Sequence, residues 1–114
     1  MKKKKMTEIE EITDLLIKFR DERNWEQFHN SKDLALALSI EAAELNELFL
    51  WKKAEDVNVD KLKEELADVL IFAFLLARRH NLGIKDIMMN KIMVNEARYP
   101  AEKAKDTAKK YSAL

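Results

Sequence analysis

The segment Leu66–Ala77 constrains this chain more than any other, because every side chain in it is apolar except that of Asp68. A helix that is apolar on every side must be buried on every side. An unpaired carboxylate inside such a helix costs several kcal/mol, so Asp68 must be neutralised, paired or bound to a metal ion. The segment therefore predicts a buried helix in which Asp68 has a partner, and part of that burial is expected to come from a second subunit.

The composition favours an all-α fold in a single domain. The 114 residues include one glycine and one proline, while 47% are hydrophobic and 37% are charged. Such a chain has little of the turn chemistry that a β-rich fold needs, and its balance suits long helices with polar outer faces. We expect a four-helix-bundle-like arrangement, with subunits packed into a helical dimer or tetramer.

Apolar periodicity and capping residues predict four helices. The first is expected at about residues 7–22 with a capping box of Thr7 and Glu10, and the second is expected to follow a cap at Ser31. The third is expected to run from a cap at Asp60 to about residue 81, where Gly83 ends it, and the fourth spans about 85–96. This divides the chain into a basic flexible start (1–6), a helical domain (7–100) and a charged tail (101–114).

Charge and hydropathy argue against several classes of protein. Lysine plus arginine and aspartate plus glutamate both number 21, so the overall charge favours neither nucleic acid nor a membrane surface as partner. The apolar run from Leu66 ends after 12 residues, which is too short to span a membrane, and the acidic stretch after Lys5 is not that of a signal peptide. With no cysteine, a soluble cytoplasmic protein is expected.

Two pairs of acids, Glu41 with Glu44 and Glu65 with Asp68, are each spaced three residues apart, so each pair projects from one face of its helix. Glu41 also occupies the place of a leucine in the seam Leu34, Leu38, Leu45, Leu48. If the second and third helices are antiparallel neighbours, the four carboxylates converge. An all-oxygen site without cysteine suits Mg²⁺ or Mn²⁺, often together with substrate phosphates.

Each acid pair has an ordinary alternative, because such spacings are common on solvated helix faces. A ferritin-like di-iron centre is disfavoured, since it needs two Glu-x-x-His pairs and only Glu26 and His29 have that spacing, at a helix boundary. The position of Asp68 in its apolar run and of Glu41 in the leucine seam favours the metal site.

Several stretches resemble the MazG-like all-α nucleotide pyrophosphohydrolases, and in particular their dCTP pyrophosphatase branch. The resemblance rests on Glu41-x-x-Glu44, then twenty residues, then Glu65-x-x-Asp68, and on "RNWEQFH", "LALALSIEAAELNELFLWK", "EELADVLIF" and "KIMVNEARYPA", within residues 20–114. It implies Mg²⁺-dependent cleavage of a nucleoside triphosphate between the α and β phosphates, giving monophosphate and pyrophosphate. It also implies a homodimer or homotetramer.

The resemblance assigns site residues one by one. Glu41, Glu44, Glu65 and Asp68 would hold the metal and form the catalytic group. Binding of base, sugar and phosphates would fall to Trp25, His29, Trp51, Lys91, Asn95, Arg98 and Tyr99. Each of these has an ordinary role as an alternative: a tryptophan as core anchor, His29 as a hydrogen-bonded structural residue, and the 91, 95, 98 stripe as a solvated helix face.

Four positions depart from that branch: its members carry glycine at Ile40 and Ala43, tyrosine at Phe72 and aspartate at Met93. Because the four acids are retained, the sequence predicts the reaction more firmly than the preferred base, for which pyrimidine deoxynucleotides such as dCTP or its 5-modified forms are favoured. House-cleaning of such nucleotides is the expected role. The alternative is a non-catalytic helical oligomer that binds metal or nucleotide.

Overall fold

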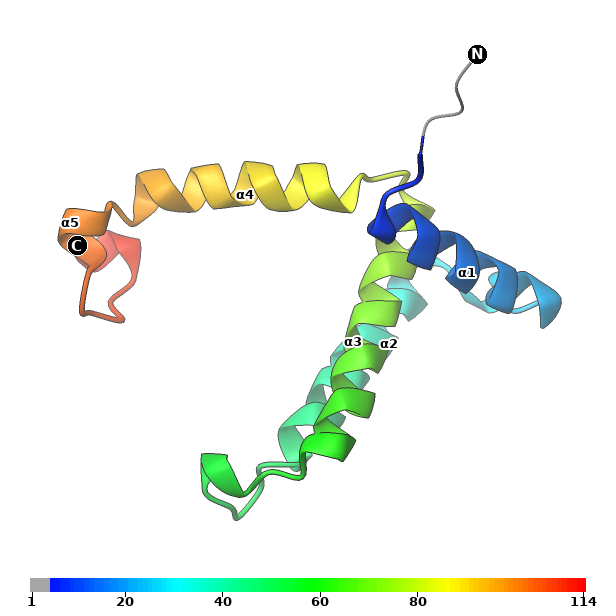
Figure 1. The fold of residues 1–114 in the computed structure, drawn as a ribbon, viewed down its shortest axis with the longest axis horizontal. Coiled ribbons are helices and arrows are strands. Elements are labelled where there is room, and N and C mark those ends of the chain that lie inside the picture. Colours follow the sequence, from blue (N-terminus) through cyan, green and yellow to red (C-terminus); the bar gives the residue numbers. More distant parts are fainter. Residues whose placement is uncertain (1–4) are drawn as a thin grey trace. The chain divides into compact units, whose positions relative to one another are not determined.

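The computed structural model describes residues 5–114, and every regular element in that range is helical (Figure 1). The α-helices are α1 (Glu8–Glu22), α2 (Ser31–Glu47), α3 (Val59–Arg79), α4 (Ile84–Arg98) and α5 (Ala101–Ala104), with 3₁₀ turns at Glu26–Phe28, Ala54–Asp56 and Tyr111–Ala113. The all-α prediction is confirmed. No helix of the described part is long and apolar enough to cross a membrane.

The chain forms two compact units, residues 1–81 and 82–114, which are described separately. In the first unit α2 runs down and α3 returns beside it, so the two form the antiparallel pair that the sequence predicts, and α1 also packs on α3 (Figure 1). The second unit contains α4, α5 and the last 3₁₀ turn. Residues 1–4 of the expected basic start lie outside the described residues, and the boundary at residue 100 stays a prediction.

Burial in α2 follows the leucine seam. Leu34 is 2% exposed, and the later seam positions Leu38, Glu41, Leu45 and Leu48 are half-buried. By contrast, Leu36 and Ile40 between the seam positions are 54% and 58% exposed. Glu41 therefore lies on the packed side of its helix.

The burial of α3 is incomplete within one chain. Only Leu75 and Ala77 of this helix are buried, and Leu66 and Leu70 are 45% and 49% exposed. The predicted burial on every side is thus not reached within the first unit, whose α3 keeps apolar side chains exposed.

The helix ends show where local patterns misled the prediction. Thr7 caps α1 as expected and accepts a hydrogen bond from the backbone N–H of Glu10. The caps of α2 and α3, however, are Asn30 and Asn58 and not Ser31 and Asp60. Asparagine and its serine or aspartate neighbour are about equally good caps, so the sequence alone did not separate them.

The end of α3 was also placed wrongly. The helix ends at Arg79, and the residue that takes the left-handed conformation after it is Asn81 (φ 53°) and not Gly83. Gly83 instead precedes α4 with an ordinary φ of −78°. Asparagine tolerates positive φ better than other side-chain-bearing residues, which explains the earlier stop. Helix α4 begins at Ile84, one residue before its expected start, and it ends at Arg98, two residues beyond its expected end.

The caps make a testable distinction. Asn58→Ala removes the side-chain acceptor 3.2 Å from the backbone N of Lys61, and should lower the free energy of unfolding by about 1 kcal/mol in urea titrations. Asp60→Ala should have a smaller effect, because this side chain lies in the first turn, makes no cap, and is replaced by a better helix former. If Asp60→Ala lowered the free energy of unfolding more than Asn58→Ala did, Asp60 would be the cap, as the sequence predicts.

Candidate functional site

The α2–α3 pair brings three carboxylates into close proximity. One carboxylate oxygen from each of Glu41, Glu44 and Glu65 lies within 4.8 Å of the other two. Glu41 and Glu65 are half-buried, while Glu44 is exposed. Asp68 is not in this close group, but it is half-buried one turn beyond Glu65 on the same helix.

Two carboxylate oxygens of the cluster, Oε2 of Glu41 and Oε2 of Glu65, are buried without a hydrogen-bond partner among the described residues. An ionised carboxylate only accepts, so it needs a donor, a proton of its own or a cation. An orphaned buried acceptor normally carries a penalty of about 1–3 kcal/mol. Two such atoms within one acidic cluster point to a bound cation.

The protonation behaviour of the cluster agrees with that interpretation. Burial, a hydrogen bond with Glu44 and then the negative charges of Glu44, Asp68 and Glu65 raise the pKa of Glu41 to about 7. Burial and then the charges of Glu44 and Asp68 also raise the pKa of Glu65. Near neutral pH the metal-free cluster therefore binds a proton more readily than ordinary glutamates do, and a divalent cation would compete with that proton.

The donor set fits a hard divalent cation. The nearby ligand atoms are all carboxylate oxygens, and the chain has no cysteine to favour a softer metal. Glu41 and Glu44 on α2 and Glu65 on α3 would hold such an ion. Asp68 would join them only after its side chain turned toward this group.

Neither tryptophan is a core anchor in this structure. Trp25, at the corner after α1, is 44% exposed, and Trp51, in the turn after α2, is 94% exposed. Trp51 also has a positive φ of 62°, which is unusual for a bulky residue. A strained, exposed aromatic ring commonly marks a place that a ligand or partner covers.

His29 ends the 3₁₀ turn Glu26–Phe28 and is half-buried. Its Nδ1 is buried and has no hydrogen-bond partner. Burial and then the charge of Arg20 lower the pKa of His29, against the opposing charge of Glu26. The imidazole is therefore neutral near pH 7.

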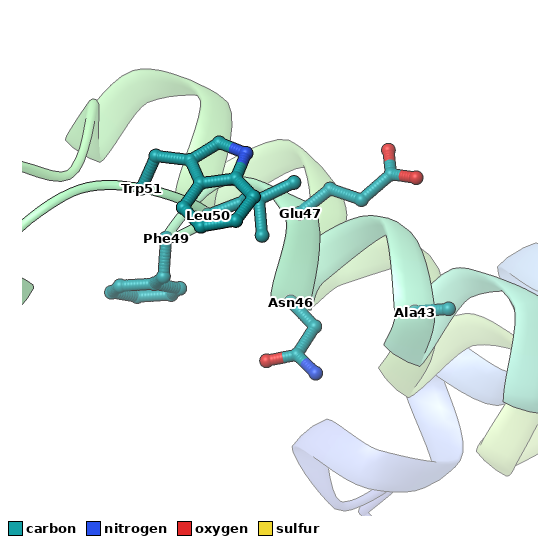
Figure 2. Close-up of a pocket in the computed structure, with 6 residues that line it drawn as sticks. All are labelled: Ala43, Asn46, Glu47, Phe49, Leu50 and Trp51. Atoms are coloured by element: carbon teal, nitrogen blue, oxygen red, sulfur yellow. The ribbon is translucent and has the colours of Figure 1, made fainter.

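An open-sided pocket of about 420 Å³ lies at the C-terminal end of α2 (Figure 2). It is lined by Ala43, Asn46, Glu47, Phe49, Leu50 and Trp51. None of the four predicted metal ligands lines it, although Ala43 directly precedes Glu44. Trp51 is the one predicted binding residue that lines this pocket. Phe49 and Leu50 also line it but were not predicted, although the apolar run "LFLW" at the end of the seam could have indicated them.

The remaining predicted binding residues belong to the second unit. Lys91, Asn95 and Arg98 lie on α4 at the predicted helical spacing, and all three are exposed. The guanidinium of Arg98 lies 4.8 Å from the ring centroid of Tyr111. Tyr99 is half-buried and meets Tyr111 edge to face at 6.0 Å.

The chain is similar to known proteins in sequence and in fold. The sequence pattern of the MazG-like family matches residues 36–114. The chain is 39% identical to dCTP pyrophosphatase 1 of Homo sapiens, over 93% of this chain and 67% of that protein, and 38% identical to its namesake in Bos taurus, over 93% and 68%. The solved structure of a pyrophosphatase from Archaeoglobus fulgidus superposes with a TM-score of 0.79 at 34% identity, covering 88% of this chain and 99% of that one.

Fold and site together define a protein with only helices among its described regular elements, whose paired helices α2 and α3 carry a partly buried cluster of acids. The chain belongs to the MazG-like family. The resemblance drawn from the sequence is thereby confirmed, including its likeness to the dCTP pyrophosphatase branch.

The raised pKa of Glu41 predicts how metal-free stability depends on pH. The folded protein holds this proton more tightly than the unfolded chain does, so the stabilisation is complete below the ordinary glutamate value of 4.5 and is lost as the pH rises to about 7. Glu41→Gln cannot ionise. Urea titrations with a chelator present should therefore show the variant gaining stability relative to the wild type between these pH values, whereas parallel curves would contradict the shift.

Proposed function

We propose that this protein is a nucleoside triphosphate pyrophosphohydrolase that releases a nucleoside monophosphate and pyrophosphate. The observation that carries the proposal is the acidic cluster of Glu41, Glu44 and Glu65, with its two orphaned buried oxygens, in a chain of the MazG-like family. The dCTP pyrophosphatases among its relatives favour a pyrimidine deoxynucleotide, dCTP or a 5-modified form, as substrate. Removal of surplus or modified nucleotides is the proposed role.

Glu41, Glu44, Glu65 and Asp68 are the proposed ligands of Mg²⁺, with Mn²⁺ as the alternative ion. Such an ion, when bound, neutralises phosphate charge and lowers the pKa of a coordinated water. The residues themselves orient the phosphates through α2 and α3, which are rigid elements. One carboxylate of the cluster is proposed to accept the proton of the attacking water.

Trp25, His29 and Trp51 are the proposed base-binding residues, and the exposed rings of the two tryptophans offer stacking surfaces. Trp25 precedes and Trp51 follows the 17-residue helix α2, which is about 25 Å long, so one base would meet both only if they came from different subunits of the proposed oligomer. Lys91, Asn95 and Arg98 present two cations and an amide from α4 for phosphate or sugar, with Tyr99 at the end of the same helix. These four assignments rest on the family motif.

A homodimer or homotetramer in the cytoplasm is the proposed working form. Its support is apolar surface that one chain leaves open on the α2–α3 pair, at Leu36, Ile40, Leu66 and Leu70, each at least 45% exposed. Sedimentation velocity should give two or four times the 13.4 kDa chain mass. A monomer at micromolar concentration would reject the assembly.

The activity is tested with a panel of canonical and 5-modified nucleoside triphosphates, incubated with the protein and Mg²⁺, with products separated by chromatography. Monophosphate and pyrophosphate are expected, with pyrimidine deoxynucleotides turned over fastest. Asp68→Asn and Glu41→Gln should each reduce kcat by at least about 100-fold while the helical circular dichroism persists, because removing repelling charges does not unfold the pair.

Asp60→Asn is the matched control, since it makes the same chemical change on α3 at a side chain that is 95% exposed. Its kcat should equal that of the wild type. Orthophosphate as product, or near-normal rates for Asp68→Asn, would contradict the proposed reaction or its ligand set.

The non-catalytic alternative predicts a different result. Mg²⁺ with a non-hydrolysable nucleotide at 100 times its dissociation constant should then add about 2.7 kcal/mol to stability, with no turnover of any nucleotide. Stabilisation without hydrolysis across the whole panel would replace the enzyme with a binding protein.

A further inference from the structure

The corner between α1 and the following 3₁₀ turn is tightly specified by its backbone. The N–H of Trp25 donates to the carbonyl of Arg20 at 3.1 Å, and the N–H of Asn24 donates to that of Asp21 at 3.0 Å. Asn24 takes the left-handed conformation with φ of 52°. This is the hydrogen-bond pattern of a Schellman motif, which fixes the direction in which the chain leaves the helix.

A Schellman motif commonly includes an apolar contact across the corner, and here both partners are aromatic. The rings of Phe19 and Trp25 meet edge to face, with centroids 5.8 Å apart. The first ring belongs to the last turns of α1, and the second follows the left-handed residue Asn24. The orientation of the indole is therefore set relative to a helix.

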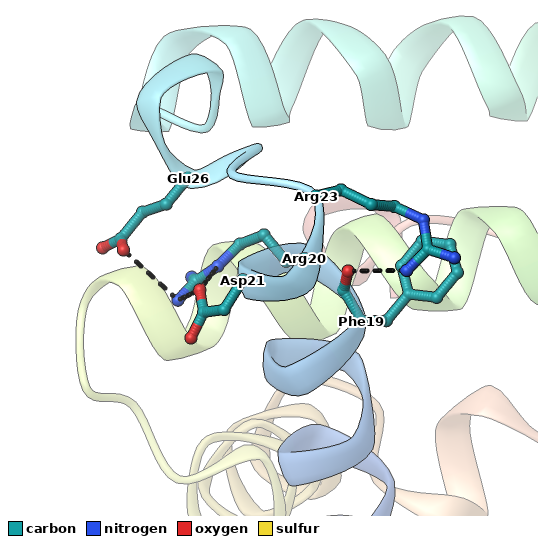
Figure 3. A network of polar contacts seen from close by, with 5 residues as sticks. All are labelled: Phe19, Arg20, Asp21, Arg23 and Glu26. Carbon is teal, nitrogen blue, oxygen red and sulfur yellow. Dashed lines mark hydrogen bonds and ion pairs between the residues drawn. The ribbon is translucent and has the colours of Figure 1, made fainter.

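Arg23 lies over the Phe19 ring of this pair (Figure 3). Its guanidinium lies 3.6 Å from the ring centroid of Phe19 and 6.0 Å from the Trp25 ring, and its Nη1 donates to the carbonyl of Phe19 at 3.0 Å. One side chain thus satisfies a terminal carbonyl of α1 and covers a face of one ring through a cation–π contact. No step of the proposed reaction uses it.

The other side of the corner is held by Arg20, whose side chain is 14% exposed. It bonds Asp21 at 2.9 Å and reaches Glu26, on the 3₁₀ turn, at 3.6 Å (Figure 3). This pairing ties the end of α1 to the segment beyond Trp25. The indole is consequently anchored on both sides along the chain.

Despite this anchoring, the rings stay accessible: Phe19 is 48% and Trp25 is 44% exposed. An aromatic ring that only stabilised the fold would gain by deeper burial. Holding an exposed ring in one orientation instead reduces the entropy lost when a flat ligand stacks on it.

We propose that Arg23 is a positioning residue that holds Trp25, through Phe19, as a stacking surface for the planar base of a nucleotide. The identity of the ligand rests on the proposed function. Arg23 does not touch the substrate; it acts by fixing the ring that does. Its loss therefore weakens binding of the base and leaves the chemical step unchanged.

The test compares Arg23→Met with Lys18→Met, a matched control that removes the same charge from an exposed position of α1. Arg23→Met should raise KM for dCTP and Kd for its α,β-methylene analogue roughly two- to fivefold with kcat unchanged. Arg23→Lys keeps the positive charge but not the planar group, so its KM and Kd should lie between those of the wild type and those of Arg23→Met. The chain has two tryptophans, so Trp25→Phe assigns the indole N–H signals in NMR spectra, and only the Arg23 variants should shift that of Trp25.

Equal Kd values for Arg23→Met and Lys18→Met overturn the proposal. The proposal also fails if Arg23→Met lowers the melting temperature and kcat but leaves KM and Kd unchanged, because that is the behaviour of a purely structural arginine. The binding arm separates this proposal from the proposed function. If the wild type hydrolyses no nucleotide but binds the analogue more weakly after Arg23→Met, the enzyme is rejected and the stacking surface stands. If the wild type does not bind the analogue, the stacking surface is rejected.

Discussion

Repulsion among carboxylates across the α2–α3 pair is the constraint on which the rest of the structure depends. Oxygens of Glu41, Glu44 and Glu65 lie within 4.8 Å of one another, and two of the cluster's oxygens are cut off from solvent without a partner. Such an arrangement persists only because the packed helices hold it, and it is relieved by a proton or by a cation. Burial and then the neighbouring carboxylates raise the pKa of Glu41, in agreement with that conflict.

Helix α2 organises the first unit around this cluster. A half-exposed tryptophan, Trp25, precedes the helix, and a nearly fully exposed one, Trp51, follows it, while its leucine seam packs against α3. The acids Glu41 and Glu44 therefore lie on α2 itself, while the exposed tryptophans lie in the segments before and after it. This is a suitable division for a ligand with a charged part and a flat part. The apolar sides of α3 that stay open suit an assembly of several chains.

The helices themselves followed from local information, which explains both the successes and the errors. Apolar spacing of three and four located α1, α2 and α3, and it marked Glu41 as an inward-facing position. The caps of α2 and α3 were misplaced by one and two residues, because two good capping residues stand close together at each start. The end of α3 was misplaced because asparagine performed the role expected of glycine.

The sequence by itself determined the fold class, the helices and the four acids, because helical periodicity depends only on residues a few positions apart. The tertiary structure decided which acids approach closely, since the distance from Glu41 to Glu65 depends on how the turn after α2 sets α3 against it. It also decided that one carboxylate oxygen of Glu41 and one of Glu65 are buried, and that Arg23 lies over Phe19. Electrostatic and aromatic contacts depend on distance and direction in space, and no spacing along the chain specifies either.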